Sequence, residues 1–257
     1  QTWSEKQAIC PEDGWARYQS CLTVIGDRMY AFVSRHNGRF VDWRNELYTS
    51  DDSGYTWIKH DPPFVPENGF VRDPVRMSNG ALLFPFHAYP VTRAQEDDCR
   101  KRNVIICESK IPYVDNGVCI GDFSAGFRTL TAFRQPAEIL PLWGGGKWRW
   151  SWSENTVVEA EAGHLIMLYR VDRADWLWRA DSFDFGETWG KPYQTDIPNP
   201  NNKPQLIQGN GGEMLLLNTP NNRPDFYLKR RFPLEVWVST DGLKTWNKKI
   251  RVSDFPG

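Results

Sequence analysis

Short hydrophobic runs recur at even spacing along the chain, and turns rich in Gly, Asn, Asp and Pro separate them. Such runs are typical of β-strands, and no stretch shows the long apolar period of an amphipathic helix. Strand–turn–strand units are expected at residues 21–33, 156–169 and 205–217. Further strands are expected at residues 81–86 and 104–107, with a charged loop at 91–102 and a turn at 115–117. The pattern predicts an all-β protein.

A polar turn occurs three times, at residues 50–57, 182–189 and 239–246. Each copy begins with Ser, has Asp two residues later and ends with a Thr-Trp pair. Ser and Asp side chains in such turns bond to nearby backbone N–H groups, and the Trp re-enters a sheet as a large apolar residue. The glycine of the third copy is Gly242, one place early, so we expect its turn geometry to differ.

The three turns indicate a repeated supersecondary unit. The second and third copies begin 57 residues apart, at Ser182 and Ser239, which suits one four-stranded antiparallel unit with its loops. The first and second copies begin 132 residues apart, which leaves room for two units. Residues 1–5 read like the end of another such turn, so we expect the sequence to be a segment of a longer polypeptide.

The balance of charges excludes some classes of partner. The 31 basic and 32 acidic residues leave a net charge of −1, so no overall field draws the chain to nucleic acid. No apolar run is long enough to span a membrane. The 13 Trp residues suit both the packing of sheets and stacking on sugar rings.

The cysteines fit none of the usual zinc spacings, and we expect no metal and no cofactor. An exported protein, secreted or periplasmic, could pair Cys10 with Cys21, or two of the remaining three; buried thiols are the alternative. The five are Cys10, Cys21, Cys99, Cys107 and Cys119.

The spacing Ser-x-Asp-x-Gly-x-Thr-Trp is the Asp box, and the chain resembles the sialidase (neuraminidase) superfamily over most of its length. The resemblance implies a β-propeller of four-stranded antiparallel blades, built from BNR repeats as a single domain over residues 1–257. About five blades of six would lie in this sequence. The boxes themselves are structural, because they also occur in propellers that bind sugars, cleave uronic-acid polymers or form parts of receptors.

Residues 153–159 and the later Arg170 are similar to a sialidase segment in which a Glu opens the inner strand of a blade and an Arg closes the next strand. The resemblance implies that Glu154 activates a Tyr nucleophile and that Arg170 is one of three arginines holding the substrate carboxylate. Sialic acid carries that carboxylate on its anomeric carbon, where it would repel an anionic nucleophile. A guanidinium group binds a carboxylate through two hydrogen bonds. An ion pair at the end of a blade is the alternative for both residues.

The resemblance supplies further candidates. Arg231 precedes the strand that leads to the third box, as the last arginine of the family's triad does. Arg17 lies where the family has its first arginine, and Asp42 lies in the loop that holds the family's acid/base Asp. Surface salt bridges are the alternative for these two. Arg72 and His87 could point into the same funnel and bind substrate, although a lone His at a strand end commonly has a structural role.

The nucleophilic Tyr of the family is expected after the third box, beyond residue 257. The resemblance thus implies an exo-acting glycoside hydrolase that removes a terminal acidic sugar from a glycan. A second hypothesis is a propeller polysaccharide lyase that acts on uronic acids. His or Tyr would supply the base and the acid, and an Arg would neutralise the substrate carboxylate; the candidates are His36, His87, Tyr169 and Arg170. A third hypothesis is a non-catalytic glycan-binding propeller, in which a Trp-rich loop at residues 143–152 stacks on sugar rings.

Overall fold

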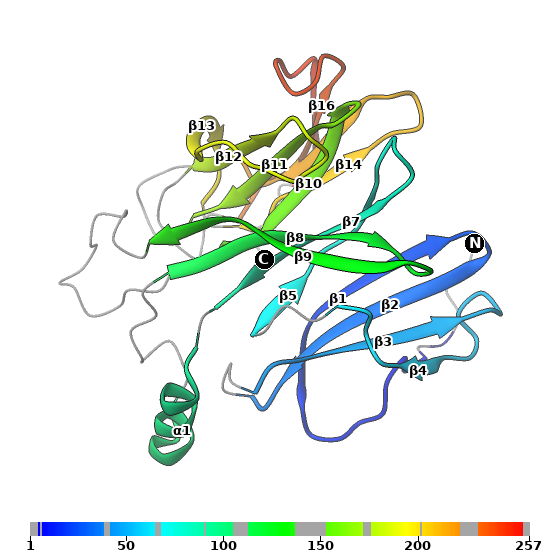
Figure 1. The fold of residues 1–257 in the computed structure, drawn as a ribbon. Helices are drawn as coiled ribbons and strands as arrows, with labels where there is room; N and C mark the ends of the chain where they lie inside the picture. Colours follow the sequence, from blue (N-terminus) through cyan, green and yellow to red (C-terminus); the bar gives the residue numbers. More distant parts are fainter. Residues whose placement is uncertain are drawn as a thin grey trace.

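The computed structural model describes residue 5 and residues 7–38, 42–64, 68–89, 91–104, 113–136, 153–171, 176–200, 202–221 and 231–253. In these residues, four antiparallel sheets pack one against the next as blades of a β-propeller (Figure 1). The strands of each blade follow sequence order across the sheet. In the second blade the first strand is divided into β5 and β6, which both pair with β7. The predicted fold class is confirmed.

The blades have the following elements. The first blade contains β1 (Ala16–Ile25), β2 (Arg28–His36), β3 (Arg44–Ser50) and β4 (Ile58–His60). The second contains β5 (Gly69–Val71), β6 (Val75–Arg76), β7 (Leu82–Ala88), β8 (Tyr113–Asp122) and β9 (Gly126–Pro136), with helix α1 (Arg93–Arg102) between β7 and β8. The third contains β10 (Asn155–Glu161), β11 (His164–Arg170), β12 (Trp176–Ser182) and β13 (Tyr193–Pro198). The fourth contains β14 (Gln205–Gln208), β15 (Met214–Asn218), β16 (Leu234–Ser239) and β17 (Lys248–Ser253).

The two faces of β7 are buried against different neighbours. Phe84 packs on Phe32 of the first blade, with ring centroids 4.9 Å apart. Leu83, the adjacent position, belongs to the hydrophobic cluster that contains Met167 of the third blade. Side chains alternate along a strand, so a strand buried on both faces needs a continuous apolar run. Each such buried side chain stabilises the fold by about 1.5–3 kcal/mol.

The described residues form four blades, whereas the repeat spacing predicted about five. The long interval between the first two boxes holds two units, as the spacing predicted, because these boxes belong to the first and third blades and the second blade, which has no box, lies between them. Helix α1 lies within that interval, and residues 137–152 separate β9 from β10. Residues 115–117, expected as a turn, instead lie within β8 and pair with β7 and β9.

Helix α1 occupies the segment that was expected to be a charged loop. Thr92 caps its N-terminus, because Thr92 Oγ1 accepts a hydrogen bond from Gln95 N at 3.3 Å and the Gln95 side chain accepts one from Thr92 N at 2.9 Å. Asn103 ends the helix in the left-handed conformation. Cys99 is its buried residue, so the helix lacks the apolar stripe that reveals helices in a sequence. Within the described part of the chain, no helix is long and apolar enough to cross a membrane.

The three boxes form the same hydrogen bonds. In each, the Asp carboxylate accepts from the backbone N–H and the hydroxyl of the Thr four residues later. Ser50 Oγ accepts from Gly54 N at 2.8 Å, and in the third box Ser239 Oγ accepts from Leu243 N at 2.9 Å. Leu243 has a φ of 62° and adopts the left-handed conformation that favours glycine. The expectation that the third turn would differ is therefore wrong.

The boxes connect the third and fourth strands of their blades, at one end of the propeller. In an antiparallel sheet, the connections from second to third strands and the starts of the first strands lie at the opposite end. We call this opposite end the mouth. It carries the starts of β1, β10 and β14 and the connection that contains α1 (Figure 1). Residues far apart in the sequence therefore meet there.

Candidate functional site

Glu154 and Arg170 form a buried ion pair at the mouth. Glu154 directly precedes β10, and Arg170 is the last residue of β11, the hairpin partner of β10. Arg170 Nη2 donates to Glu154 Oε1 at 3.1 Å, and Arg170 Nε contacts Glu154 Oε2. The Glu154 side chain is 0% exposed and that of Arg170 is 5% exposed. Because little water screens this pair, its charges act strongly on neighbouring groups.

Lys203 lies on the other side of Glu154. It comes from the connection before β14, and its Nζ is 3.7 Å from Glu154 Oε1. The same Nζ lies 4.6 Å from the centroid of the Tyr18 ring, within the range of a cation–π contact. Burial lowers the pKa of Lys203, and the charge of Glu154 opposes this effect. With 37% of its side chain exposed, Lys203 also reaches solvent.

Tyr18 joins this group from the start of β1. Burial raises the pKa of Tyr18 to about 12, and the charge of Glu154 acts in the same direction, whereas Arg170, Arg72 and Arg231 oppose it. The phenol therefore lies in the field of one carboxylate and three arginines. We define the mouth cluster as Tyr18, Arg72, Glu154, Arg170, Lys203 and Arg231. Its four cations and one carboxylate give an excess of positive charge that favours an anionic ligand.

Arg72 connects three blades. Its Nε donates to the Asn155 carbonyl of the third blade at 2.9 Å, and its Nη2 donates to the Pro204 carbonyl before the fourth blade at 3.3 Å. The side chain is buried, and burial lowers its pKa from the usual arginine value. Arg72 thus satisfies two backbone carbonyls at the mouth and supplies positive charge below its surface.

His87 is fully buried in β7. Its ring stacks on Phe70 with centroids 4.6 Å apart. Among the described residues, neither ring nitrogen of His87 has a hydrogen-bond partner. Burial holds the pKa of His87 well below its usual range, and the nearby charges of Arg72 and Lys203 act in the same direction. The imidazole is therefore neutral at physiological pH.

The structure brings Arg231 towards the mouth cluster but places Arg17 elsewhere. Arg231 is exposed, and its charge acts on Tyr18. Arg17 binds the Asp13 carboxylate and also donates to the carbonyls of Trp15 and Pro11, both at 2.8 Å. The strand register shifts just after Arg17, as in a β-bulge. At this point of β1 it is Tyr18, not Arg17, that contacts Lys203.

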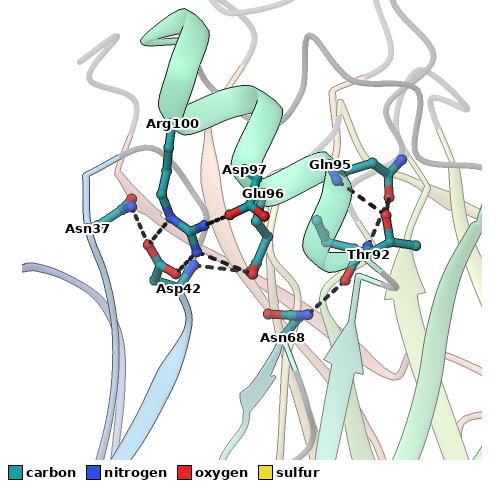
Figure 2. Close-up of polar contacts among 9 residues, drawn as sticks. Asn37, Asp42, Asn68, Thr92, Gln95, Glu96, Asp97 and Arg100 are labelled. Atoms are coloured by element: carbon teal, nitrogen blue, oxygen red, sulfur yellow. Dashed lines mark hydrogen bonds and ion pairs between the residues drawn. The ribbon is translucent and has the colours of Figure 1, made fainter.

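Asp42 is bound to helix α1, as Figure 2 shows. Arg100 Nε donates to Asp42 Oδ2 at 3.0 Å, Arg100 Nη2 contacts the other oxygen, and Asn37 Nδ2 donates at 2.6 Å. The bond to Arg100 is the main cause that holds the pKa of Asp42 below its ordinary value. A carboxyl group with a low pKa is ionised at neutral pH, whereas a general acid must hold its proton. The contact therefore favours a role for Asp42 in docking α1.

The remaining sequence candidates have structural surroundings or lie outside the described residues. His36 packs on Trp43 with ring centroids 4.4 Å apart, and Tyr169 is buried in the cluster between the second and third blades. In the described residues, no group of three His, Cys, Asp or Glu side chains could hold a metal ion. Cys107, the Trp-rich loop at 143–152 and most of the strand expected at 104–107 lie outside the described residues. The described cysteines, all free thiols, are Cys10, Cys21, Cys99 and Cys119.

Two members of the mouth cluster, Tyr18 and Lys203, were missed from the sequence. Both lie near the beginning of the first strand of a blade, as Glu154 does. Tyr18 is the third residue of β1, whereas Glu154 and Lys203 lie one and two residues before their strands, so alignment of the blades on their first strands would have placed the three near one another. The box spacing could not supply that alignment, because the boxes lie at the other end of the sheets.

Comparison with solved structures shows the same fold in several glycan-acting proteins. The Hadza microbial sialidase Hz136 superposes with a TM-score of 0.62 at 14% identity, covering 95% of this chain and 47% of its own. The Trypanosoma rangeli sialidase gives 0.56 at 14% identity, with 94% and 40% covered. The exo-beta-1,3-galactanase 1,3Gal43A from Clostridium thermocellum gives 0.54 at 12% identity, with 90% and 47% covered. The chain thus spans about half the length of the Hadza sialidase.

Identities this low establish a common fold and do not transfer an activity. We find no match to the chain among curated proteins. The sequence matches the family described as BNR repeat-like domain over residues 1–256. This match covers all four blades, and the chain therefore belongs to the BNR repeat-like domain family.

Proposed function

We propose that the protein is a glycoside hydrolase of the sialidase type, which removes a terminal acidic sugar from a glycan. The observation that carries the proposal is the position of Glu154, a fully buried carboxylate held between Arg170 and Lys203 at the mouth. The fold shared with sialidases and a galactanase supports a role in carbohydrate chemistry. The excess of positive charge in the mouth cluster supports an acidic sugar as the ligand.

The residues divide into those that face the ligand and those that hold the site. Lys203 and Arg231 reach solvent, so we assign them to the carboxylate of the sugar. Arg170 orients Glu154 through the buried ion pair. Arg72 fixes the blades around the mouth through two backbone carbonyls and adds to the positive field.

Tyr18 is our candidate for the nucleophile, in place of a Tyr beyond residue 257. Its phenol lies in the field of Glu154, and its pKa of about 12 means that it needs a base to lose its proton. In the proposed step, the Tyr18 oxygen bonds to the anomeric carbon as the glycosidic C–O bond breaks, Glu154 accepts the phenol proton, and the departing oxygen takes a proton from solvent. In a second step water attacks the anomeric carbon and releases a proton to solvent, the glycosyl–Tyr bond breaks, and Glu154 returns its proton to the Tyr18 oxygen.

The direct test is turnover of 4-methylumbelliferyl α-N-acetylneuraminide by the wild type, Glu154→Gln, Tyr18→Phe and Arg76→Gln. We expect kcat/KM to fall at least about 100-fold in the first two variants, because each loses the proposed proton transfer. Arg76 is an exposed arginine at the opposite end of β7 from the mouth, and its variant should match the wild type. The proposal would be contradicted if the wild type released fluorophore neither from this sialoside nor from the matching β-glucuronide.

A polysaccharide lyase is the second candidate, and His87 is the observation that favours it. A neutral imidazole whose nitrogens find no hydrogen-bond partner in the described part of the chain, close to the charge of Arg72, has the properties of a base that abstracts a proton beside a neutralised carboxylate. Because His87 is fully buried, we rank the lyase below the hydrolase. A rise in absorbance from an unsaturated uronide, lost in His87→Ala, would favour the lyase. Binding of the sugar without turnover would favour a glycan-binding propeller.

A further inference from the structure

A pocket opens beside α1, outside the mouth cluster. Its volume is about 430 Å³, within the size range of pockets that hold small ligands. The connection before β3, the residue before β5 and the first turns of α1 contribute its walls. The residues that matter for its chemistry are Asp42, Trp43, Arg44, Asn68, Arg93 and Glu96. We call it the α1 pocket.

The walls of the α1 pocket are fixed by side chains that bond to one another (Figure 2). Glu96 Oε1 accepts from Asp42 N at 3.3 Å, and Arg100 of α1 binds the Asp42 carboxylate. Asn68 Nδ2 donates to the Val91 carbonyl at 3.3 Å, just before the helix. These bonds hold α1 against the first blade. The pocket is therefore already formed without a ligand, which lowers the entropic cost of binding.

Two exposed arginines, Arg44 and Arg93, line these walls. The charge of Arg44 acts on the Asp42 carboxylate without a direct ion pair, because Arg100 binds that carboxylate. Arg100, by contrast, is neutralised by Asp42, Glu96 and Asp97. Arg93 is also the first residue of α1, where a cation meets the positive end of the helix dipole. A bound anion would remove that unfavourable interaction and satisfy both guanidinium groups.

The α1 pocket is separated from the mouth cluster by one aromatic contact. Trp43 lines the pocket, and its ring packs against the ring of Tyr18 with centroids 5.9 Å apart. Tyr18 in turn contacts Lys203. The pocket and the mouth cluster therefore lie on the two sides of the Trp43–Tyr18 contact.

We propose that the α1 pocket binds an acidic group, a carboxylate or a sulfate, on the leaving-group side of the glycan. Arg44 and Arg93 hold the anion, and Trp43 forms the wall between this subsite and the mouth. The inference rests on the proposed function for the nature of the ligand, a glycan. It adds that the substrate carries a second acidic unit next to the terminal one.

The test is calorimetric titration at about 0.15 M ionic strength, where the charges of exposed groups are screened over about 8 Å. The probes are a chondroitin sulfate tetrasaccharide, its desulfated form and neutral chitotetraose. The proteins are the wild type, the double variant Arg44→Gln/Arg93→Gln and the control Arg76→Gln, which removes an exposed arginine at the opposite end of the second blade. We expect the wild type to bind a charged probe at least about tenfold more tightly than chitotetraose. The double variant should lose about tenfold, and the control should not change.

The two charged probes distinguish a carboxylate from a sulfate. If the wild type binds the desulfated tetrasaccharide, the site binds a carboxylate; if it binds only the sulfated tetrasaccharide, the site binds a sulfate. Equal affinity of the double variant and the wild type for the charged probes would overturn the inference, as would an equal loss in Arg76→Gln. Absence of binding by the wild type would overturn it as well. Because the titration needs no turnover, a protein that binds through Arg44 and Arg93 but cleaves no glycoside would contradict only the hydrolase.

Discussion

Arg170 Nη2 donates to Glu154 Oε1 at 3.1 Å across the open end of the β10–β11 hairpin, in a pair that water scarcely reaches. The hairpin register places the two residues there, because Asn155 pairs with Tyr169 and Arg170 N donates to the Glu154 carbonyl at 3.2 Å. The carboxylate is thereby fixed in position before any ligand arrives. Such preorganisation is useful to a catalytic or binding group.

Removal of one partner should show how strongly this pair is coupled to the fold. In Arg170→Met, Glu154 stays buried opposite an uncharged side chain, so we expect the free energy of unfolding to fall by about 3–5 kcal/mol. The double variant Glu154→Gln/Arg170→Met leaves no buried charge from the pair and should recover much of the loss. Urea unfolding measures both. Losses that simply add in the double variant would show that the pair is not coupled.

Arg72 should matter for stability more than the exposed arginines. Arg72→Leu removes the donors for the Asn155 and Pro204 carbonyls, and we expect a loss of about 2–5 kcal/mol in the free energy of unfolding. Arg76→Leu is the control, because that side chain is exposed and should change stability by less than about 0.5 kcal/mol. The same urea titration applies. A small loss in Arg72→Leu would mean that water or another side chain replaces the guanidinium group.

The boxes should make the protein sensitive to acid. Hydrogen bonds from the Thr four residues on lower the pKa of Asp52 and of Asp241 to about 2, below the value of about 3.9 in an unfolded chain. A depressed folded-state pKa contributes stability that is complete above the unfolded pKa and is lost as the pH falls towards 2. The difference in Tm between the wild type and Asp52→Asn should thus be constant above about pH 5 and should shrink between about pH 4 and pH 2. If the Tm difference stays constant down to pH 2, the ionised form of the Asp52 carboxylate is not what stabilises the turn.

Asp42 should act on the position of α1 and not on proton transfer. Arg100 binds its carboxylate, so we expect Asp42→Asn to change kcat/KM for a methylumbelliferyl glycoside by less than about threefold. Glu154→Gln should lower the same quantity at least about 100-fold. Proteolysis of the α1 connection should become faster in Asp42→Asn, since the helix loses its contact with the first blade. A loss of turnover in Asp42→Asn equal to that in Glu154→Gln would restore Asp42 as the general acid.

The sequence was informative where structure is local. Each box is closed by bonds between residues two and four positions apart, so Ser50 and Asp52 identify a turn without knowledge of the rest. The burial of both Leu83 and Phe84, on opposite faces of β7, likewise follows from an apolar run between turns. Helix α1 was missed because its side chains bond to each other and to the first blade, and Cys99 alone of its residues is buried.

The candidate site could be predicted only in part, because some of its residues meet through contacts between distant parts of the chain. Glu154 and Arg170 belong to one hairpin, and a family resemblance was enough to pair them. Tyr18 and Lys203 come from different blades and meet through the closure of the sheets, which no local pattern records. Arg17 shows the same limit, because a shift of one residue in register beside it decides which side chain of β1 contacts Lys203.

The central claim is that the mouth binds the carboxylate of an acidic sugar. Its most direct test is calorimetric titration of the wild type and Lys203→Met with N-acetylneuraminic acid and with the methyl ester of the same sugar, which differs only in lacking the charge. We predict that the wild type binds the acid at least about tenfold more tightly than the ester and that Lys203→Met loses this preference. Equal affinity of the wild type for acid and ester, or no binding of either, would contradict the account.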